Sequence, residues 1–259
     1  MEMIKALLPS ILLLTMSFAG ESAEKKNPLE QAIDLLYQEI KPGNELEKSI
    51  FNLSMVGYYN MKKNELLQDD SVITIIDYRK ASKNKRFFVI NLVEKKVLYS
   101  TLVAHGKGSG AQFAEIFSNK PGSLKSSIGF FITDDSYYGK HGYSLKLQGV
   151  EPGVNDKAMQ RAIVIHGASY VSESFIKRYG RLGRSWGCPA LPEDITREVI
   201  DKIKGGSCLF VYSEDQDYLK KSTFLNRESA TRYFLEMSEF PTTTDSSNSK
   251  TDNLETVQP

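Results

Sequence analysis

The sequence contains few of the residues from which metal sites and disulfides are built. It has two cysteines and three histidines in 259 residues, and the histidines are scattered, with no carboxylate at ligand spacing. We therefore expect no metal site and no bound cofactor. The chain also has almost no net charge, because 33 Lys and Arg nearly balance 32 Asp and Glu. Nothing in the charge draws this chain toward nucleic acid.

Long apolar runs are absent beyond the N-terminus. There, Lys5 precedes an apolar stretch that ends at Phe18, and small residues follow up to Ala23. A basic start, a short apolar run and small residues are typical of a secretory signal peptide, which we assign to residues 1–23. An uncleaved anchor is the alternative, although the run is shorter than the ~20 residues that span a bilayer. We expect export to the periplasm or cell envelope, without stable membrane insertion after cleavage.

The rest of the chain divides into a helical hairpin (24–67), a main domain (68–236) and a disordered polar tail (237–259). Helix caps are predicted at Asn27 and Asn44, each followed by apolar residues at helical spacing. Strands are predicted at 72–76, 86–93, 96–104, 129–133, 143–147, 162–166 and 208–212, with helices at 172–179 and 192–204. The main domain is therefore of the α+β class, mostly strands with inserted helices.

One histidine and one cysteine stand where catalysis needs them. His166 ends an apolar strand and precedes Gly167, and Cys188 follows Gly187 in a turn shortly before a helix. A free thiol with a pKa of about 8.5 is only slightly ionised at neutral pH, so it needs a base to become a nucleophile. The amides of Gly187 and Cys188 are candidate donors to an oxyanion.

These segments resemble a known family. His166-Gly167 followed by Ser185-Trp186-Gly187-Cys188 is similar to the His-Gly … Ser-x-Gly-Cys signature of the L,D-transpeptidases, whose catalytic domain is called YkuD. The predicted hairpin that begins at Arg86 and the glycine turn at His105-Gly106 resemble the start of that domain. The resemblance covers 86–212, which is most of the predicted core.

The resemblance implies a fold, a reaction and roles. It implies a mostly β YkuD-like domain in which Cys188 attacks a peptidoglycan tetrapeptide stem before its terminal D-Ala and forms a thioester. An amine or water then resolves the thioester, giving transpeptidation or L,D-carboxypeptidation. By this likeness His166 is the base, and the carbonyl of Gly167 orients its ring. The residues implied or considered for substrate contact are Arg184, Ser185, Trp186 and His141.

This chain departs from the family pattern at two positions. Many members carry His two residues before the cysteine and Arg two residues after it, where this chain has Trp186 and Ala190. The missing Arg removes an obvious partner for a substrate carboxylate, a role open to Arg184 or Arg181. Trp186 is either a packing residue or a wall that stacks on the stem peptide.

A second hypothesis concerns the two cysteines. In an exported chain Cys188 and Cys208 are candidates for a disulfide. The protein would then be a non-catalytic envelope protein that binds peptidoglycan in the same groove. Against this, Cys208 opens an apolar strand and fits a buried core thiol.

Overall fold

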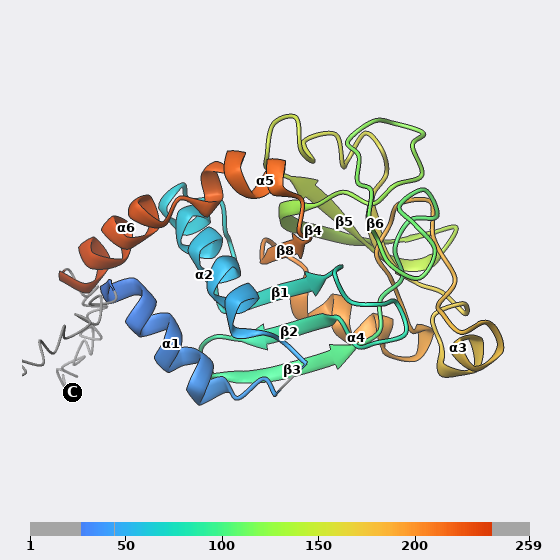
Figure 1. Cartoon of the computed structure of the whole chain (residues 1–259), viewed down its shortest axis with the longest axis horizontal. Coiled ribbons are helices and arrows are strands. Elements are labelled where there is room, and N and C mark those ends of the chain that lie inside the picture. The colour runs from blue at the N-terminus through green and yellow to red at the C-terminus, as the bar shows by residue number, and fades with distance from the viewer. Residues whose placement is uncertain (1–26, 44, 240–259) are drawn as a thin grey trace, which may run out of the picture.

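The computed structural model describes residues 27–43 and 45–239, and they form one mixed sheet with helices on both faces (Figure 1). The predicted signal peptide, the cap at Asn44 and residues 240–259 lie outside this range. The helices are α1 (Pro28–Ile40), α2 (Lys48–Lys63), α3 (Glu173–Tyr179), α4 (Glu193–Ile203), α5 (Gln216–Lys221) and α6 (Arg227–Glu239). The strands are β1 (Val72–Asp77), β2 (Phe87–Asn91), β3 (Lys96–Thr101), β4 (Gly129–Gly139), β5 (Gly142–Gly149), β6 (Val164–Gly167), β7 (Ala190–Leu191) and β8 (Cys208–Tyr212). The predicted α+β class is confirmed.

The eight strands run in the order β3-β2-β1-β8-β4-β5-β6-β7. Neighbours are antiparallel except β1 with β8 and β6 with β7, which are parallel. Two-sided burial explains the composition of the central strands, since every residue of β1 and β8 is buried. Beyond β3, Ala104 exchanges backbone hydrogen bonds with Ala190 of β7. The two ends of the sheet order are thus joined, and the sheet curls into a barrel-like form.

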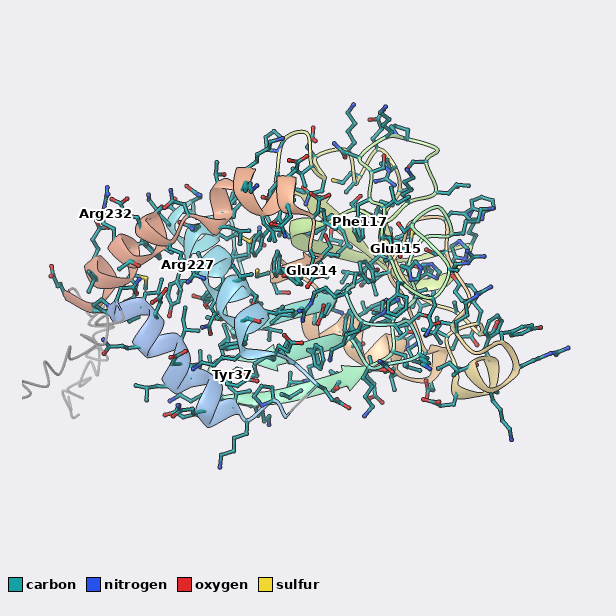
Figure 2. The ribbon with its side chains drawn as sticks, in the orientation of Figure 1. Tyr37, Glu115, Phe117, Glu214, Arg227 and Arg232 are labelled. Carbon is teal, nitrogen blue, oxygen red and sulfur yellow. The ribbon has the colours of Figure 1, made fainter. Side chains whose placement is uncertain are left out.

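Helices from both ends of the chain cover one face of this sheet. Helix α2 packs on β1 and β8, and α6 packs beside α1 and α2 (Figure 1). Gly57 permits the close approach of α2, because a Cβ there would lie 1.8 Å from the ring of Phe130. Arg227, labelled in Figure 2, forms an ion pair with Glu30 of α1 at 2.9 Å. The predicted N-terminal hairpin is therefore one part of a layer that the C-terminal helix completes.

The element boundaries agree with the sequence at some points and differ at others. Asn27 caps α1 as predicted, its side chain accepting from the amide of Glu30 at 2.8 Å. Helix α2 begins only at Lys48, after a cap residue, Glu47, whose side chain makes no capping bond. Strand β4 is longer than predicted, and α5, α6 and β7 were not predicted. Helix α6 ends at Glu239, so its last turn enters the segment assigned to the polar tail.

Candidate active site

Pairing between β6 and β7 brings the predicted base and nucleophile to one corner. His166 stands opposite Ala190 in the parallel register, and Cys188 lies just before β7. The amide of His166 also donates to the carbonyl of Pro189. Residues far apart in the sequence are therefore held side by side by backbone hydrogen bonds.

The turn that carries Cys188 is shaped by its serine and glycine. The Ser185 hydroxyl donates to the carbonyl of Cys188 at 2.6 Å and accepts from the amide of Gly187 at 3.0 Å. Gly187 has φ +130, and a Cβ there would lie 2.8 Å from the carbonyl oxygen of Lys125. Ser185 thus stabilises the turn, and the Gly187 amide predicted for the oxyanion is hydrogen-bonded to it. The Cys188 amide is the other predicted donor.

A second glycine turn, at His105-Gly106, packs against the turn that carries Cys188. The amide of Ser185 donates to the carbonyl of His105, and the amide of Lys107 donates to the carbonyl of Ser185. Gly106 between them allows close contact, since a Cβ there would lie 2.8 Å from the Cα of Gly187. The His105-Gly106 segment, predicted as a turn near the cleft, thus packs against the turn that carries Cys188.

The ring of His166 is held by a hydrogen bond at Nδ1 and by a stacked ring. Its Nδ1 lies 2.9 Å from the carbonyl oxygen of Gly167, and a carbonyl can only accept, so Nδ1 carries the proton and Nε2 is the free basic nitrogen. Gly167 must be a glycine because a Cβ there would lie 2.9 Å from the Thr196 hydroxyl of α4. The ring of His141 stacks on the ring of His166, with the ring centroids 4.5 Å apart.

Electrostatics favour a neutral thiol beside a neutral imidazole. Burial raises the pKa of Cys188, opposed by the Val164 amide and the charges of Arg161 and Lys140. Burial also lowers the pKa of His166, with further lowering by His141 and Lys140. The Cys188 thiol lies 3.5 Å from the carbonyl oxygen of Ala162. Over residues 27–43 and 45–239, no hydrogen bond joins it to His166, so the thiol must turn before a proton can pass between them.

Both groups line a cavity of about 330 Å³. Its wall contains every side chain predicted to contact substrate: His141, Arg184, Ser185 and Trp186. Trp186 is 67% exposed, which argues against the core-packing alternative, and its side chain lines the cavity. Arg184 reaches the cavity while donating to the carbonyl of Gly110 at 2.9 Å. Arg181 is not part of the wall.

The wall also contains polar and aromatic side chains that the sequence did not assign to substrate contact: Tyr137, Lys140, Arg161 and Tyr170. Burial raises the pKa of the Tyr170 phenol to about 12, so it stays protonated. Arg161 is fixed by acceptors from a distant loop, including the carbonyl of Lys125 at 2.6 Å and the hydroxyl of Ser127. These contacts are set by tertiary packing. The only local signal was the position of Arg161 just before β6.

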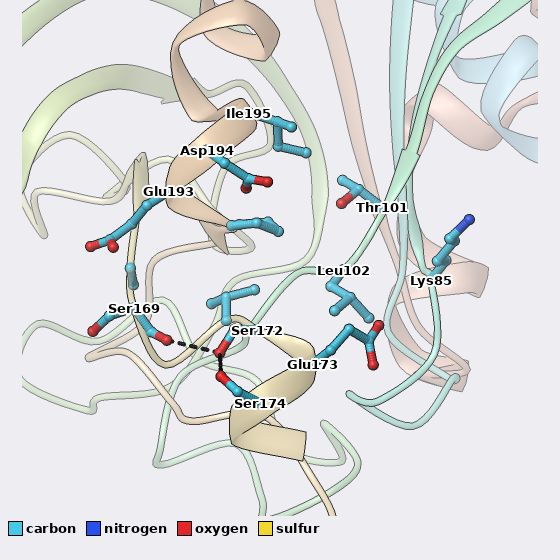
Figure 3. Close-up of a pocket in the computed structure, with 13 residues that line it drawn as sticks. Lys85, Thr101, Leu102, Ser169, Ser172, Glu173, Ser174, Glu193, Asp194 and Ile195 are labelled. Atoms are coloured by element: carbon cyan, nitrogen blue, oxygen red, sulfur yellow. Dashed lines mark hydrogen bonds between the residues drawn. The ribbon is translucent and has the colours of Figure 1, made fainter. Parts of the chain in front are cut away.

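A larger cavity, of about 570 Å³, lies between β3 and the starts of α3 and α4 (Figure 3). Its charged wall residues are Lys85, Glu173, Glu193 and Asp194. On one side of the cavity the Ser172 hydroxyl donates to the carbonyl of Ser169 at 3.1 Å (Figure 3). The wall holds neither a cysteine nor a histidine, so size alone does not identify the reactive site.

Both cysteines are free thiols, against the hypothesis of a Cys188–Cys208 disulfide. Cys208 is fully buried in β8, where its sulfur contacts the sulfur of Met61 at 3.5 Å. Burial raises the pKa of Cys208 far above its usual value, which makes it an inert core thiol. Within the described part of the chain, no group of His, Cys, Asp and Glu could hold a metal ion. In the same part, no helix is both long and apolar enough to cross a membrane.

Comparison with known proteins gives one family match and several distant structural matches. The family described as L,D-transpeptidase catalytic domain (YkuD_2) matches residues 42–212, more than half of the chain. No curated protein matches. Among solved structures, an L,D-transpeptidase from Mycobacterium smegmatis is 15% identical, with TM-score 0.34 and coverage of 55% of this chain and 59% of that one.

Two other solved structures are equally distant. L,D-transpeptidase 3 from Mycobacterium tuberculosis is 10% identical, with TM-score 0.35 and coverage of 55% and 61%. The helical cell shape determining protein Pgp2 from Campylobacter jejuni is 13% identical, with TM-score 0.38 and coverage of 72% and 64%. The chain spans less than two thirds of each of these structures.

Proposed function

This chain belongs to the family of L,D-transpeptidase catalytic domains, and we propose that it is an exported peptidoglycan L,D-transpeptidase with Cys188 as its nucleophile. The substrate is a tetrapeptide stem, and the same thioester gives L,D-carboxypeptidase activity when water resolves it. The enzyme works in the periplasm or cell envelope. It needs no metal or cofactor, because thiol and imidazole together supply the nucleophile and the base.

The observation that supports this proposal most is the pairing of a thiol with an imidazole on one cavity wall. Cys188 and His166 both face the cavity of about 330 Å³. The Gly167 carbonyl fixes the Nδ1 proton, so Nε2 is the nitrogen that can accept the thiol proton. A structural thiol such as Cys208 has no such neighbour.

In the first half-reaction the Cys188 thiol turns away from Ala162 and passes its proton to Nε2 of His166. The sulfur attacks the carbonyl before the terminal D-Ala, and the tetrahedral oxyanion is stabilised by the Cys188 amide. When the C–N bond breaks, His166 returns the proton to the departing amine. D-Ala leaves, and a thioester remains on Cys188.

In the second half-reaction an acceptor amine or water gives its proton to His166 and attacks the thioester carbonyl. Collapse of the intermediate breaks the C–S bond, and His166 returns the proton to the sulfur. The thiol is restored with no net change of protons on the enzyme. Because Cys188 and His166 rest as a neutral pair, base catalysis accompanies the attack.

Release of D-Ala from tetrapeptide-bearing muropeptides tests the proposal. The wild-type protein should release D-Ala, and Cys188→Ala should reduce the rate by at least about a thousandfold. Cys208→Ala is the matched control, because it removes the other thiol from a site remote from the cavity. Mass spectrometry of the products with and without an amine acceptor separates transfer from hydrolysis. Undiminished release by Cys188→Ala would refute the nucleophile assignment.

A further inference from the structure

The ammonium groups of two lysines lie close to the indole of Trp186, which lines the cavity. Lys107 Nζ lies 5.5 Å from the ring, and Lys140 Nζ lies 5.4 Å from it. The indole is mostly exposed, so this arrangement buries little apolar surface. An ammonium group attracted to a ring face keeps its donors free for another partner. Of the two lysines, only Lys140 is part of the cavity wall.

The cavity wall carries positive charge with nothing to balance it. Its charged residues are Lys140, Arg161 and Arg184, and it contains neither Asp nor Glu. This contrasts with the near balance of charge in the whole chain. A cavity lined by one sign of charge concentrates ligands of the opposite sign. The wall therefore suits an anionic group.

The three cationic side chains of the wall differ in how many of their N–H donors already form hydrogen bonds. Both terminal nitrogens of Arg161 donate to oxygens of the 118–127 segment. Arg184 gives one terminal nitrogen to the carbonyl of Gly110. Lys140, on the turn between β4 and β5, has no hydrogen bond or ion pair within residues 27–43 and 45–239, and its ammonium group lies over the Trp186 ring. Its three N–H donors are available.

We propose that Lys140, held against Trp186, binds the free carboxylate of the terminal D-amino acid of the donor peptide. This proposal rests on the proposed function and names the group by which the donor is recognised. The leaving group is a single amino acid, so its carboxylate lies one residue, about 3.8 Å along the chain, beyond the scissile bond. Lys140 lines the same cavity as Cys188, and its charge acts on the Cys188 thiol. Lys140 is thus the specificity residue that selects a peptide ending one residue after the cleavage point.

Binding measured without turnover tests this role directly. In a Cys188→Ala background, calorimetry would compare a tetrapeptide that ends in a free carboxylate with the same peptide ending in a carboxamide. Lys140→Gln should weaken binding of the free acid about fivefold and leave binding of the carboxamide unchanged. Lys107→Gln is the matched control, since Lys107 contacts the same ring at nearly the same distance outside the cavity wall. It should change neither affinity.

Each outcome decides between the two proposals. Equal weakening for both peptides, or equal effects of both lysine variants, would overturn the carboxylate role of Lys140. Unchanged binding of the free acid by Lys140→Gln would also overturn it. In active protein, Lys140→Gln should raise KM for the free acid more than KM for the carboxamide, because its effect on the pKa values of His166 and Cys188 acts on both substrates alike. Failure of the wild-type enzyme to release D-Ala would instead refute the proposed function, whatever the binding results.

Discussion

The two buried histidines of this protein, His166 and His105, have different surroundings. His166 lines the cavity, and its Nδ1 is fixed by the Gly167 carbonyl. His105 lies in the turn that packs against the turn carrying Cys188. His105 is wholly buried, and its Nδ1 lies 2.9 Å from Nη2 of Arg86. Because a guanidinium can only donate, this nitrogen of His105 is an acceptor and the ring is neutral.

The pKa shifts of the two histidines have the same direction, so a shift alone does not identify the base. Burial, helped by Arg86, lowers the pKa of His105 to about 3, and burial also lowers that of His166. The remaining nitrogen of His105, Nε2, faces the carbonyl of Gly110 at 3.4 Å. What distinguishes His166 is a free nitrogen on a cavity that also holds a thiol.

The largest effect is expected for the replacement of His166 by Asn. The same replacement at His105, made in a separate variant, is the comparison. His166→Asn keeps a donor for the Gly167 carbonyl and removes the basic nitrogen, so kcat for D-Ala release should fall by about 10²–10⁴-fold. His105→Asn keeps an acceptor for Arg86, and activity should stay within about threefold of wild type, since the ring only supports the turn. Steady-state kinetics at neutral pH and a temperature below unfolding would compare the variants. Equal losses of activity in the two variants would contradict the different roles assigned to His166 and His105.

The sequence could single out Cys188 and His166, the proposed nucleophile and base, because the signals around them are local. A strand end followed by Gly167, and a turn with Ser185 and Gly187 before a helix, are visible in short windows. The side chains that complete the cavity come from remote segments, and Arg161 is fixed by the 118–127 loop. No local pattern could place them. The orientation of the Cys188 thiol toward Ala162 is likewise a product of packing.

The C-terminal helix shows a different limit. Helix α6 is mainly polar and buries only Ala230 fully, so its periodicity is weak. It is held by tertiary contacts, such as the ring of Phe234 against Tyr59 at 5.5 Å. One local signal was present: the Asn226 side chain accepts from the amide of Ser229, as a capping residue does. A cap followed by a polar stretch was insufficient to predict a helix.

A smaller effect is expected on acid stability, and it should come from His105. Its pKa is about 3 in the folded protein and about 6.5 when unfolded. Above about pH 6.5 both states are neutral, and as the pH falls further only the unfolded chain gains the proton, which favours unfolding. From about pH 7 to about pH 5 this should cost about 2 kcal/mol, or about a 30-fold change in the folding equilibrium.

Urea unfolding at the two pH values would measure this cost in the wild type and in His105→Asn. The variant is less stable overall, but it should lose about 2 kcal/mol less on acidification because its side chain does not titrate. His166 also becomes protonated on unfolding, so the wild-type loss exceeds the share of His105, and the difference between the proteins isolates that share. An identical pH dependence in both would mean that folding leaves the pKa of His105 unchanged.

The smallest effect is expected from His141, which lines the cavity and stacks on the ring of His166. Burial is the main cause of the lowered pKa of His166, and the charges of His141 and Lys140 add to it. His141→Gln removes one of these charges, so the pKa of His166 should rise and the acid limb of the kcat/KM profile should move to higher pH by less than about half a unit. Near that limb the variant should lose less than about threefold in activity relative to its own plateau. A purely structural role for His141 would lower the plateau and leave the midpoint in place, whereas a shift to lower pH would mean that His141 helps His166 to hold its proton.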